Sequence, residues 1–204
     1  MDDFRIQKVL PTIEFLKKAG AKVILIAHLE NEADDSLVPV FEYLKKLFQN
    51  HEIKKTYLAL VYGKVLPESG TIKKPIRLKP GSTKRTIWKG KMEKEAITEY
   101  KVIKSVRCQA SSGEENIFSL LRVMPKTGRT HQIRIHLASI HHPIVGDTLY
   151  GSKTNPFNLN RQFLHAESLE FSTEDGKRIK IESELPEELK GFLQILESGK
   201  KKFV

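Results

Sequence analysis

The first fifty residues show two helical patterns separated by a short apolar run. Residues 6–19 place apolar side chains at helical spacing, and Gly20 follows as a natural helix stop. Residues 22–27 form a continuous apolar run of strand length, which is typical of a buried parallel strand. Ser36 can cap a second helix. The apolar face of that helix would consist of Val40, Tyr43, Leu44 and Leu47.

From Thr56 onward the chain consists of short runs of strand length, broken by glycine and proline. These runs predict strands at residues 57–62, 70–78, 83–89, 97–106, 117–124, 163–171 and 177–182. The last two are joined by Glu174-Asp-Gly176, which is a hairpin turn signal. Helical spacing returns over residues 131–140, and Pro186 begins a final short helix that runs to about Leu196.

Composition narrows the class of protein. The chain has 204 residues and 39% apolar residues, which is enough to bury a core. It has no run of eighteen apolar residues, and its first residues do not resemble a secretory signal. The single cysteine, Cys108, excludes an internal disulfide framework and a multi-cysteine zinc site. We therefore expect a soluble cytoplasmic protein.

The net charge of +10 is unevenly distributed along the chain. Residues 1–50 hold 7 Lys/Arg and 8 Asp/Glu, whereas residues 51–204 hold 28 and 17. The excess is densest over residues 51–104, with 14 basic and 5 acidic residues. A polyanion such as nucleic acid is the simplest partner for such a surface. The alternative is a solvated lysine-rich face that keeps the protein soluble.

Candidate chemistry gathers in residues 126–136, Lys-Thr-Gly-Arg-Thr-His-Gln-Ile-Arg-Ile-His. Gly128 gives a turn before a helix, and the Thr130 hydroxyl can cap that helix. Arg129 beside a helix N-terminus would favour an anion. Helical spacing puts Ile133 on the core face and leaves Arg134 free to face a groove. A surface helix with incidental charges is the alternative.

This string resembles the signature of the RluA-like RNA pseudouridine synthases. Three further blocks resemble the same family and keep its order, so that the likeness covers about 160 residues from about Phe41 onward. They are Lys55–Gly63, His142–Gly151 and Leu164–Phe171, and the last leads to Leu185-Pro-Glu-Glu-Leu189. The resemblance implies an α+β fold, with a mixed, mainly antiparallel sheet and flanking helices behind the short helix–strand–helix segment.

The resemblance also implies a reaction and its residues. Such enzymes break the N-glycosidic bond of a uridine in ribosomal or transfer RNA, turn the base and rejoin it through carbon, without metal or cofactor. An aspartate acts on the sugar, a tyrosine stacks on the base, and an arginine pairs with the aspartate. By motif match the tyrosine is Tyr57 and the arginine is Arg134. The RNA-binding residues would be Lys126, Thr127, Gly128, Arg129, Thr130, His131 and Gln132.

Each of these residues also has a plainer interpretation. Tyr57 lies in an alternating strand and could belong to the core, and Arg134 could bind an RNA phosphate instead of a carboxylate. We interpret His131 and His136 as structural histidines with satisfied hydrogen bonds. Asp147 follows a glycine in a turn, and we interpret it as structural as well.

The nucleophilic aspartate is missing from its expected place. The family motif His-Arg-Leu-Asp-x-x-Thr-Ser-Gly is absent, and its aspartate would align near Leu25, inside an apolar run without a carboxylate. Asp34 and Asp35 are the nearest candidates, and Asp35 is the weak substitute. Loss of the aspartate favours a second hypothesis, in which the chain is a catalytically inactive RNA-binding module.

Residues 1–41 resemble a different family, phosphoglycerate kinase. The resemblance rests on Asp3-Phe-Arg-Ile, Leu10–Leu16, Gly20–His28 and Ser36–Val40. Arg5 and His28 fall on positions that help bind phosphoglycerate there, which gives a third hypothesis, a small-acid-binding fragment. The Gly-Arg-Pro that usually follows the histidine is replaced by Glu-Asn-Glu. We therefore predict a kinase-like segment at 1–41 and a synthase domain, without its N-terminal part, at 42–204, and we expect a monomer.

Overall fold

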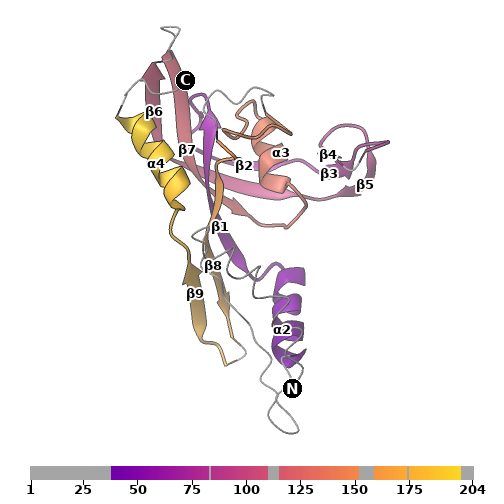
Figure 1. Ribbon diagram of the computed structural model, residues 1–204. Helices are drawn as coiled ribbons and strands as arrows, with labels where there is room; N and C mark the ends of the chain where they lie inside the picture. The colour runs from indigo at the N-terminus through magenta and orange to yellow at the C-terminus, as the bar shows by residue number, and fades with distance from the viewer. Residues whose placement is uncertain (1–37, 83, 110–114, 152–158, 174, 199–204) are drawn as a thin grey trace, which may run out of the picture.

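The computed structural model describes residues 38–198, apart from 83, 110–114, 152–158 and 174 (Figure 1). Two sheets and three helices make up this part of the chain. The elements are α2 (Val38–Gln49), β1 (Lys54–Tyr62), β2 (Ser69–Lys73), β3 (Ile76–Leu78), β4 (Arg85–Thr86), β5 (Lys91–Lys94), β6 (Ile97–Gln109), β7 (Glu115–Pro125), α3 (Gln132–Ala138), β8 (Leu164–Ser172), β9 (Arg178–Glu182) and α4 (Glu187–Glu197).

The main sheet has six strands in the order β2-β6-β7-β1-β8-β9, and every neighbouring pair is antiparallel. Its two longest strands, β6 and β7, form the longest ladder, and β1 lies between β7 and β8. The predicted α+β class with a mainly antiparallel sheet is therefore confirmed. The predicted hairpin of the last two strands is also present, as β8 and β9.

The pairing register assigns α3 and α4 to opposite faces of this sheet. Tyr57 lies opposite Val123, and Val123 lies opposite Tyr100, so all three side chains share one face. Thr98 is two residues from Tyr100 on the same face, and it is hydrogen-bonded to α3. Lys104 lies on the other face, opposite Leu120, and forms an ion pair with α4. Tyr57 consequently points to the face that α3 covers.

The core lies between the main sheet and these helices. Consecutive residues are buried in the middle of β1 (59–61) and of β7 (118–121), so both faces of these two strands contribute to the core. Among the largest fully buried side chains are Leu60, Phe118, Leu121, Leu137, Phe163 and Leu189. Each such side chain contributes about 2 kcal/mol by leaving water, which makes this sheet a firm platform for the residues that it carries.

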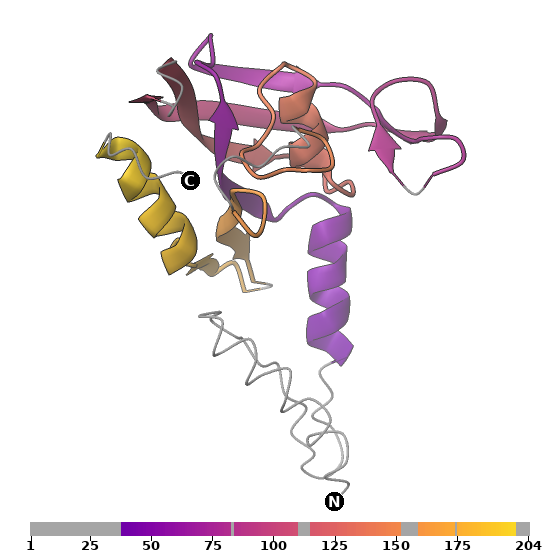
Figure 2. The same ribbon diagram turned by 45° about the horizontal axis from the view of Figure 1, so that its top comes forward.

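A second, three-stranded sheet, in the order β4-β3-β5, lies beyond α3 from the main sheet (Figures 1 and 2). The strand predicted at 70–78 is divided at Pro75 into β2 and β3, which belong to different sheets. The strand predicted at 83–89 shrinks to the two residues of β4. The sequence pattern missed β5 because all four of its residues are exposed and show no apolar alternation.

The N-terminal segment was expected to form a helix and a strand over 6–19 and 22–27, and both lie outside the described residues. The second predicted helix is present as α2, whose Leu47 is buried. Its Tyr43 hydroxyl donates a hydrogen bond to the Ser172 carbonyl at the end of β8, 2.8 Å away. Within the described part of the chain, no helix is both long and apolar enough to cross a membrane.

Candidate active site

Tyr57 sits in the middle of the main sheet, on the face that α3 covers. Its strand is held on both sides, since Tyr57 pairs with Val123 of β7 and with Ala166 of β8. The ring is half-buried and packs against the core, and burial raises the pKa of the phenol. Its hydroxyl has no protein hydrogen-bond partner among the described residues. Tyr57 therefore offers a neutral aromatic surface that is only partly used by the core.

A closed polar network fixes the segment before α3. The Gln132 side chain donates to the Ile97 carbonyl and to Thr98 Oγ1, both at 2.9 Å. Its oxygen accepts from Thr127 Oγ1 at 2.7 Å and from the Arg129 backbone N–H at 2.9 Å. Thr127 in turn accepts from the Ile97 N–H. All four hydrogen-bonding positions of the Gln132 amide are filled, so this buried side chain ties the loop to β6.

His136 completes the same network from the opposite end of α3. The ring is fully buried, with Nδ1 2.8 Å from Thr98 Oγ1 and Nε2 2.9 Å from the Lys74 carbonyl. Because a carbonyl only accepts, Nε2 carries the proton and Nδ1 accepts from the Thr98 hydroxyl. Burial lowers the pKa of His136 and keeps it neutral. The interpretation of His136 as a structural histidine is confirmed.

The start of α3 differs from the prediction. The residue before the helix is His131, whose backbone is left-handed at φ 57°, and no side chain caps the helix. The predicted cap by Thr130 is therefore wrong. The helix has only seven residues, and the Gln132 side chain anchors the chain before it through the Arg129 N–H. The predicted anion site at a helix N-terminus consequently loses its basis, although Arg129 itself remains near the surface.

Arg134 reaches a carboxylate that the sequence analysis did not connect to it. Its Nε and Nη2 each donate to one oxygen of Asp147, both at 2.7 Å. The side chains are 15% and 1% exposed, so this is a well-shielded bidentate pair. Burial alone would raise the pKa of Asp147, but the hydrogen bonds from Arg134 and from the backbone of Tyr150 and Leu149 outweigh it and lower the pKa.

The turn that carries Asp147 is built for this contact. Gly146 has a φ of 77°, and a Cβ at this position would lie 2.5 Å from the Arg161 carbonyl oxygen. Asp147 Oδ1 accepts from the backbone N–H groups of Leu149 and Tyr150, each at 3.0 Å. With the bonds from Arg134, Oδ1 accepts three hydrogen bonds and Oδ2 accepts one. These bonds support the interpretation of Asp147 as structural, and they show that Asp147 also holds the Arg134 side chain in place.

Tyr150 joins Arg134 to His131. The Arg134 guanidinium lies 5.1 Å from the centre of the Tyr150 ring, and the His131 ring meets that ring edge-on at 5.5 Å. His131 Nδ1 lies 2.9 Å from the Tyr150 hydroxyl, which also accepts from the Arg85 N–H. Burial and the charge of Arg134 lower the pKa of His131. The sequence block Asp147-Thr-Leu-Tyr-Gly151 was the signal that could have identified Tyr150.

Of the seven predicted RNA-binding residues, two are buried and five are at least partly exposed. Thr127 and Gln132 are buried, so their side chains face inward instead of toward RNA, which corrects that part of the prediction. Gly128 and Thr130 are exposed, and Arg129 is half-exposed with Nε bonded to the Glu95 carbonyl at 2.9 Å. The remaining two are Lys126, ion-paired with Glu99 at 2.9 Å, and the half-exposed His131.

The structure does not supply the missing nucleophile. Asp34 and Asp35 lie outside the described residues. Within them, the carboxylate bound to Arg134 is that of Asp147, whose oxygens are already occupied. No group of three or more potential metal-binding side chains occurs in the described part of the chain.

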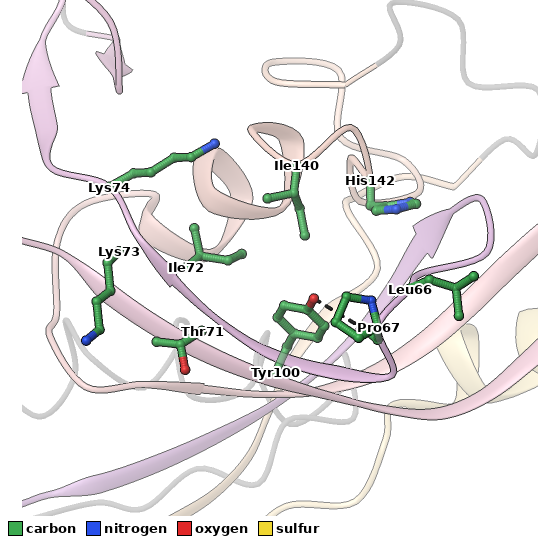
Figure 3. Close-up of a pocket in the computed structure, with 9 residues that line it drawn as sticks. All are labelled: Leu66, Pro67, Thr71, Ile72, Lys73, Lys74, Tyr100, Ile140 and His142. Carbon is green, nitrogen blue, oxygen red and sulfur yellow. Dashed lines mark hydrogen bonds between the residues drawn. The ribbon is translucent and has the colours of Figure 1, made fainter.

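A cavity of about 510 Å³ opens at the other end of α3 (Figure 3). Its walls come from β2, the segment before it, β6 and the residues after α3. Ile140 points toward Tyr100 from across the cavity, and the Tyr100 hydroxyl faces the Pro67 carbonyl at 3.5 Å. Lys73 and Lys74 line it and no carboxylate does, so it offers no acid for the chemistry that Tyr57 and Arg134 imply.

Comparisons with known proteins agree with this geometry. Residues 40–139 match the family described as RNA pseudouridylate synthase. A ribosomal large subunit pseudouridine synthase C of Rickettsia felis is 34% identical over 181 residues, which is 85% of this chain and 57% of that protein. An uncharacterized RNA pseudouridine synthase of Mycobacterium bovis is 38% identical over 163 residues, which is 76% of this chain and 49% of that protein. The chain thus spans about half the length of these relatives.

Two solved human structures have the same fold. RNA pseudouridylate synthase domain containing 1 is similar with a TM-score of 0.58 at 26% identity, over 70% of this chain and 58% of that one. RNA pseudouridylate synthase domain containing 4 is similar with a TM-score of 0.62 at 22% identity, over 94% of this chain and 83% of that one. Residues 1–69 also match the phosphoglycerate kinase family, a weak partial match that overlaps the first. In the structure β1 of this overlap pairs with β7 and β8.

Proposed function

We propose that this chain, whose residues 40–139 match the RNA pseudouridylate synthase family, isomerises uridine to pseudouridine in ribosomal or transfer RNA. The observation that carries the proposal is that Tyr57 and α3, with Arg134, share one face of the main sheet. In the reaction the C1′–N1 bond of a uridine breaks and a C1′–C5 bond forms. C5 loses a proton and N1 gains one, so substrate and product have the same atoms.

The proposed role of Tyr57 follows from its surroundings. A uracil taken out of its stack needs an aromatic platform in a sheltered site. The half-buried ring of Tyr57 offers one, and its raised pKa keeps the phenol neutral, so that it adds no charge against the base. Arg134 is held by Asp147 through Nε and Nη2, and Nη1 remains to act on a phosphate or on a catalytic carboxylate.

The test is turnover on a uridine-containing ribosomal or transfer RNA labelled with tritium at C5, because bond formation at C5 releases the label. We expect Tyr57→Ala to reduce release at least about tenfold, since the stacking of one base on an aromatic ring is worth about 1–3 kcal/mol. Tyr62→Phe is the matched control, since Tyr62 lies in the same strand on the opposite face and is equally half-buried. Equal losses in both variants would contradict the role of Tyr57.

A second function is favoured by the occupied state of Arg134. Because Asp147 already fills the position of a carboxylate partner, the chain could bind RNA without converting it. Salt-sensitive binding of the same RNA, without any release of tritium, would identify such a catalytically inactive RNA-binding module.

We further propose the division of the chain into a phosphoglycerate-kinase-like segment at 1–41 and a synthase domain at 42–204. The match of residues 1–69 to the kinase family supports the first part. The pairing of β1 within the main sheet supports a boundary before residue 54. Kinase activity is not proposed. The chain would act as a monomer in the cytoplasm.

A further inference from the structure

The small sheet of β3, β4 and β5 carries a dense positive charge. Residues 76–95 contain seven Lys/Arg and two Asp/Glu. Arg77 is used internally, since it pairs with Glu93 and donates to the Ile87 carbonyl at 2.9 Å. The other cations form no ion pair within the described residues. They are Lys79, Lys84, Arg85, Lys89, Lys91 and Lys94. Their charge is therefore available to a polyanion outside the protein.

The single tryptophan of the chain, Trp88, stands in the middle of these cations and is 75% exposed. Its backbone is fixed, since its N–H donates to Thr86 Oγ1 at 3.0 Å. The chain after it packs closely on β3, because a Cβ on Gly90 would lie 2.5 Å from the Leu78 carbonyl oxygen. An exposed indole on a fixed backbone, flanked by lysines, has the chemistry of a platform for a nucleobase.

A basic pocket of about 140 Å³ separates this sheet from the loop before α3. Arg85 and Lys94 line it from the small sheet, and Arg129 lines it from the loop. Arg129 is oriented by the bond from its Nε to the Glu95 carbonyl. Met92, which is 65% exposed, forms part of the rim. Three cations that converge from two segments suit a phosphate group.

We propose that this unit is a site for single-stranded RNA, in which Trp88 stacks on an unpaired base and the pocket of Arg85, Lys94 and Arg129 binds a backbone phosphate. The inference rests on the proposed function, because it places the strand that carries the target uridine. The pocket is lined partly by Arg129, which belongs to the loop that leads into α3, and α3 carries Arg134.

The experiment uses the emission of Trp88, which is the chain's own reporter. The full chain is titrated with a uridine-rich single-stranded RNA of about twelve nucleotides, within the span of known single-strand sites. We expect saturable quenching of the tryptophan. Binding measured independently by fluorescence anisotropy should weaken at least about fivefold in Trp88→Ala and change little in Trp88→Phe, which keeps a stacking ring.

The charge of the pocket is tested by salt dependence. Each phosphate contact contributes about 0.7 to the slope of log affinity against log salt for a single strand. The variant R85A/K94A should therefore flatten this slope by about 0.7, since the two cations would share one phosphate. The matched control is K101A/K177A, which removes two exposed lysines from the main sheet and from the β8–β9 turn. Its slope should stay closer to that of the unaltered chain.

Three outcomes would overturn the proposal. They are unchanged tryptophan emission at saturating RNA, equal affinity of Trp88→Ala and the unaltered chain, and equal quenching by heparin, which has charge but no bases. The result is separable from the turnover test. Quenching without tritium release leaves this site standing and removes the proposed activity, whereas release by a chain whose tryptophan does not respond does the reverse.

Discussion

At the scale of single residues, the pair of Arg134 and Asp147 decides what the candidate site can do. The sequence indicates Arg134 through its motif and Asp147 through its turn, but nothing in the sequence pattern joins the two. Thirteen positions separate the two, and only the path of the chain after α3 brings them together. Gln132 shows the same limit, since a polar residue in a basic motif suggests a surface role until its four buried hydrogen bonds are seen.

Asp147→Asn should destabilise the protein because it leaves the Arg134 charge without its buried partner. We expect a loss of about 3 kcal/mol in the free energy of unfolding at pH 7, measured by urea denaturation. The folded state lowers the pKa of Asp147, so its contribution is fully present above the unfolded value of about 3.9. It is lost as the pH falls through the still lower folded value, and the two proteins should converge there.

The control for this prediction is Glu167→Gln on β8. Glu167 forms an equally bidentate pair with Arg122, at 3.0 Å for both bonds, but that arginine is 50% exposed. Exposed pairs contribute at most about 1 kcal/mol. A loss at Asp147 no larger than at Glu167 would show that burial does not strengthen the Arg134 pair.

At the scale of elements, the strands of the main sheet were the most predictable part of the fold. Short apolar runs mark β1 and β7 because both faces of these strands are packed in the core. The small sheet was not predictable in the same way. Its strands have two to four residues, and β5 buries none of them, so no alternation is imposed on their sequence.

The seven-residue helix α3 depends on the polar network around Thr98 more than on its own propensity. Thr98→Val keeps the shape of the side chain but removes the acceptor of Gln132 and the donor of His136. We expect a loss of about 2–4 kcal/mol in the free energy of unfolding, since two buried polar groups are left unsatisfied. Hydrogen exchange should show faster opening of α3 amides than of β7 amides.

Thr71→Val is the comparison for this element. Thr71 is an exposed residue of β2, where the same change of hydroxyl to methyl leaves no buried partner. Thr71→Val should change the free energy of unfolding by no more than about 0.5 kcal/mol. If both valine variants unfold at the same denaturant concentration, the network does not hold α3 in place.

At the scale of the whole molecule, the described residues carry the proposed stacking ring of Tyr57 and the proposed cation Arg134, whereas the aspartate of the family motif is expected from the N-terminal segment. Tyr57, Arg134, the basic small sheet and four strands of the main sheet, β1, β2, β6 and β7, all lie in residues 54–134. From the family motif we expect its aspartate to align near Leu25, in the apolar run at 22–27, which lies outside the described residues. Asp147 cannot replace it, because four hydrogen bonds occupy its oxygens and the side chain is 1% exposed.

Asp35→Ala therefore decides whether the N-terminal segment contributes to catalysis. If Asp35 acts on the sugar, its loss should reduce tritium release at least about 100-fold and leave the affinity for RNA unchanged, since binding depends on the basic residues far along the chain. Asp34→Ala is the neighbouring control, with the same change of charge. Equal release by both variants and the unaltered chain would exclude Asp35. If the unaltered chain releases no tritium either, while it still binds RNA, the noncatalytic module is the function that remains.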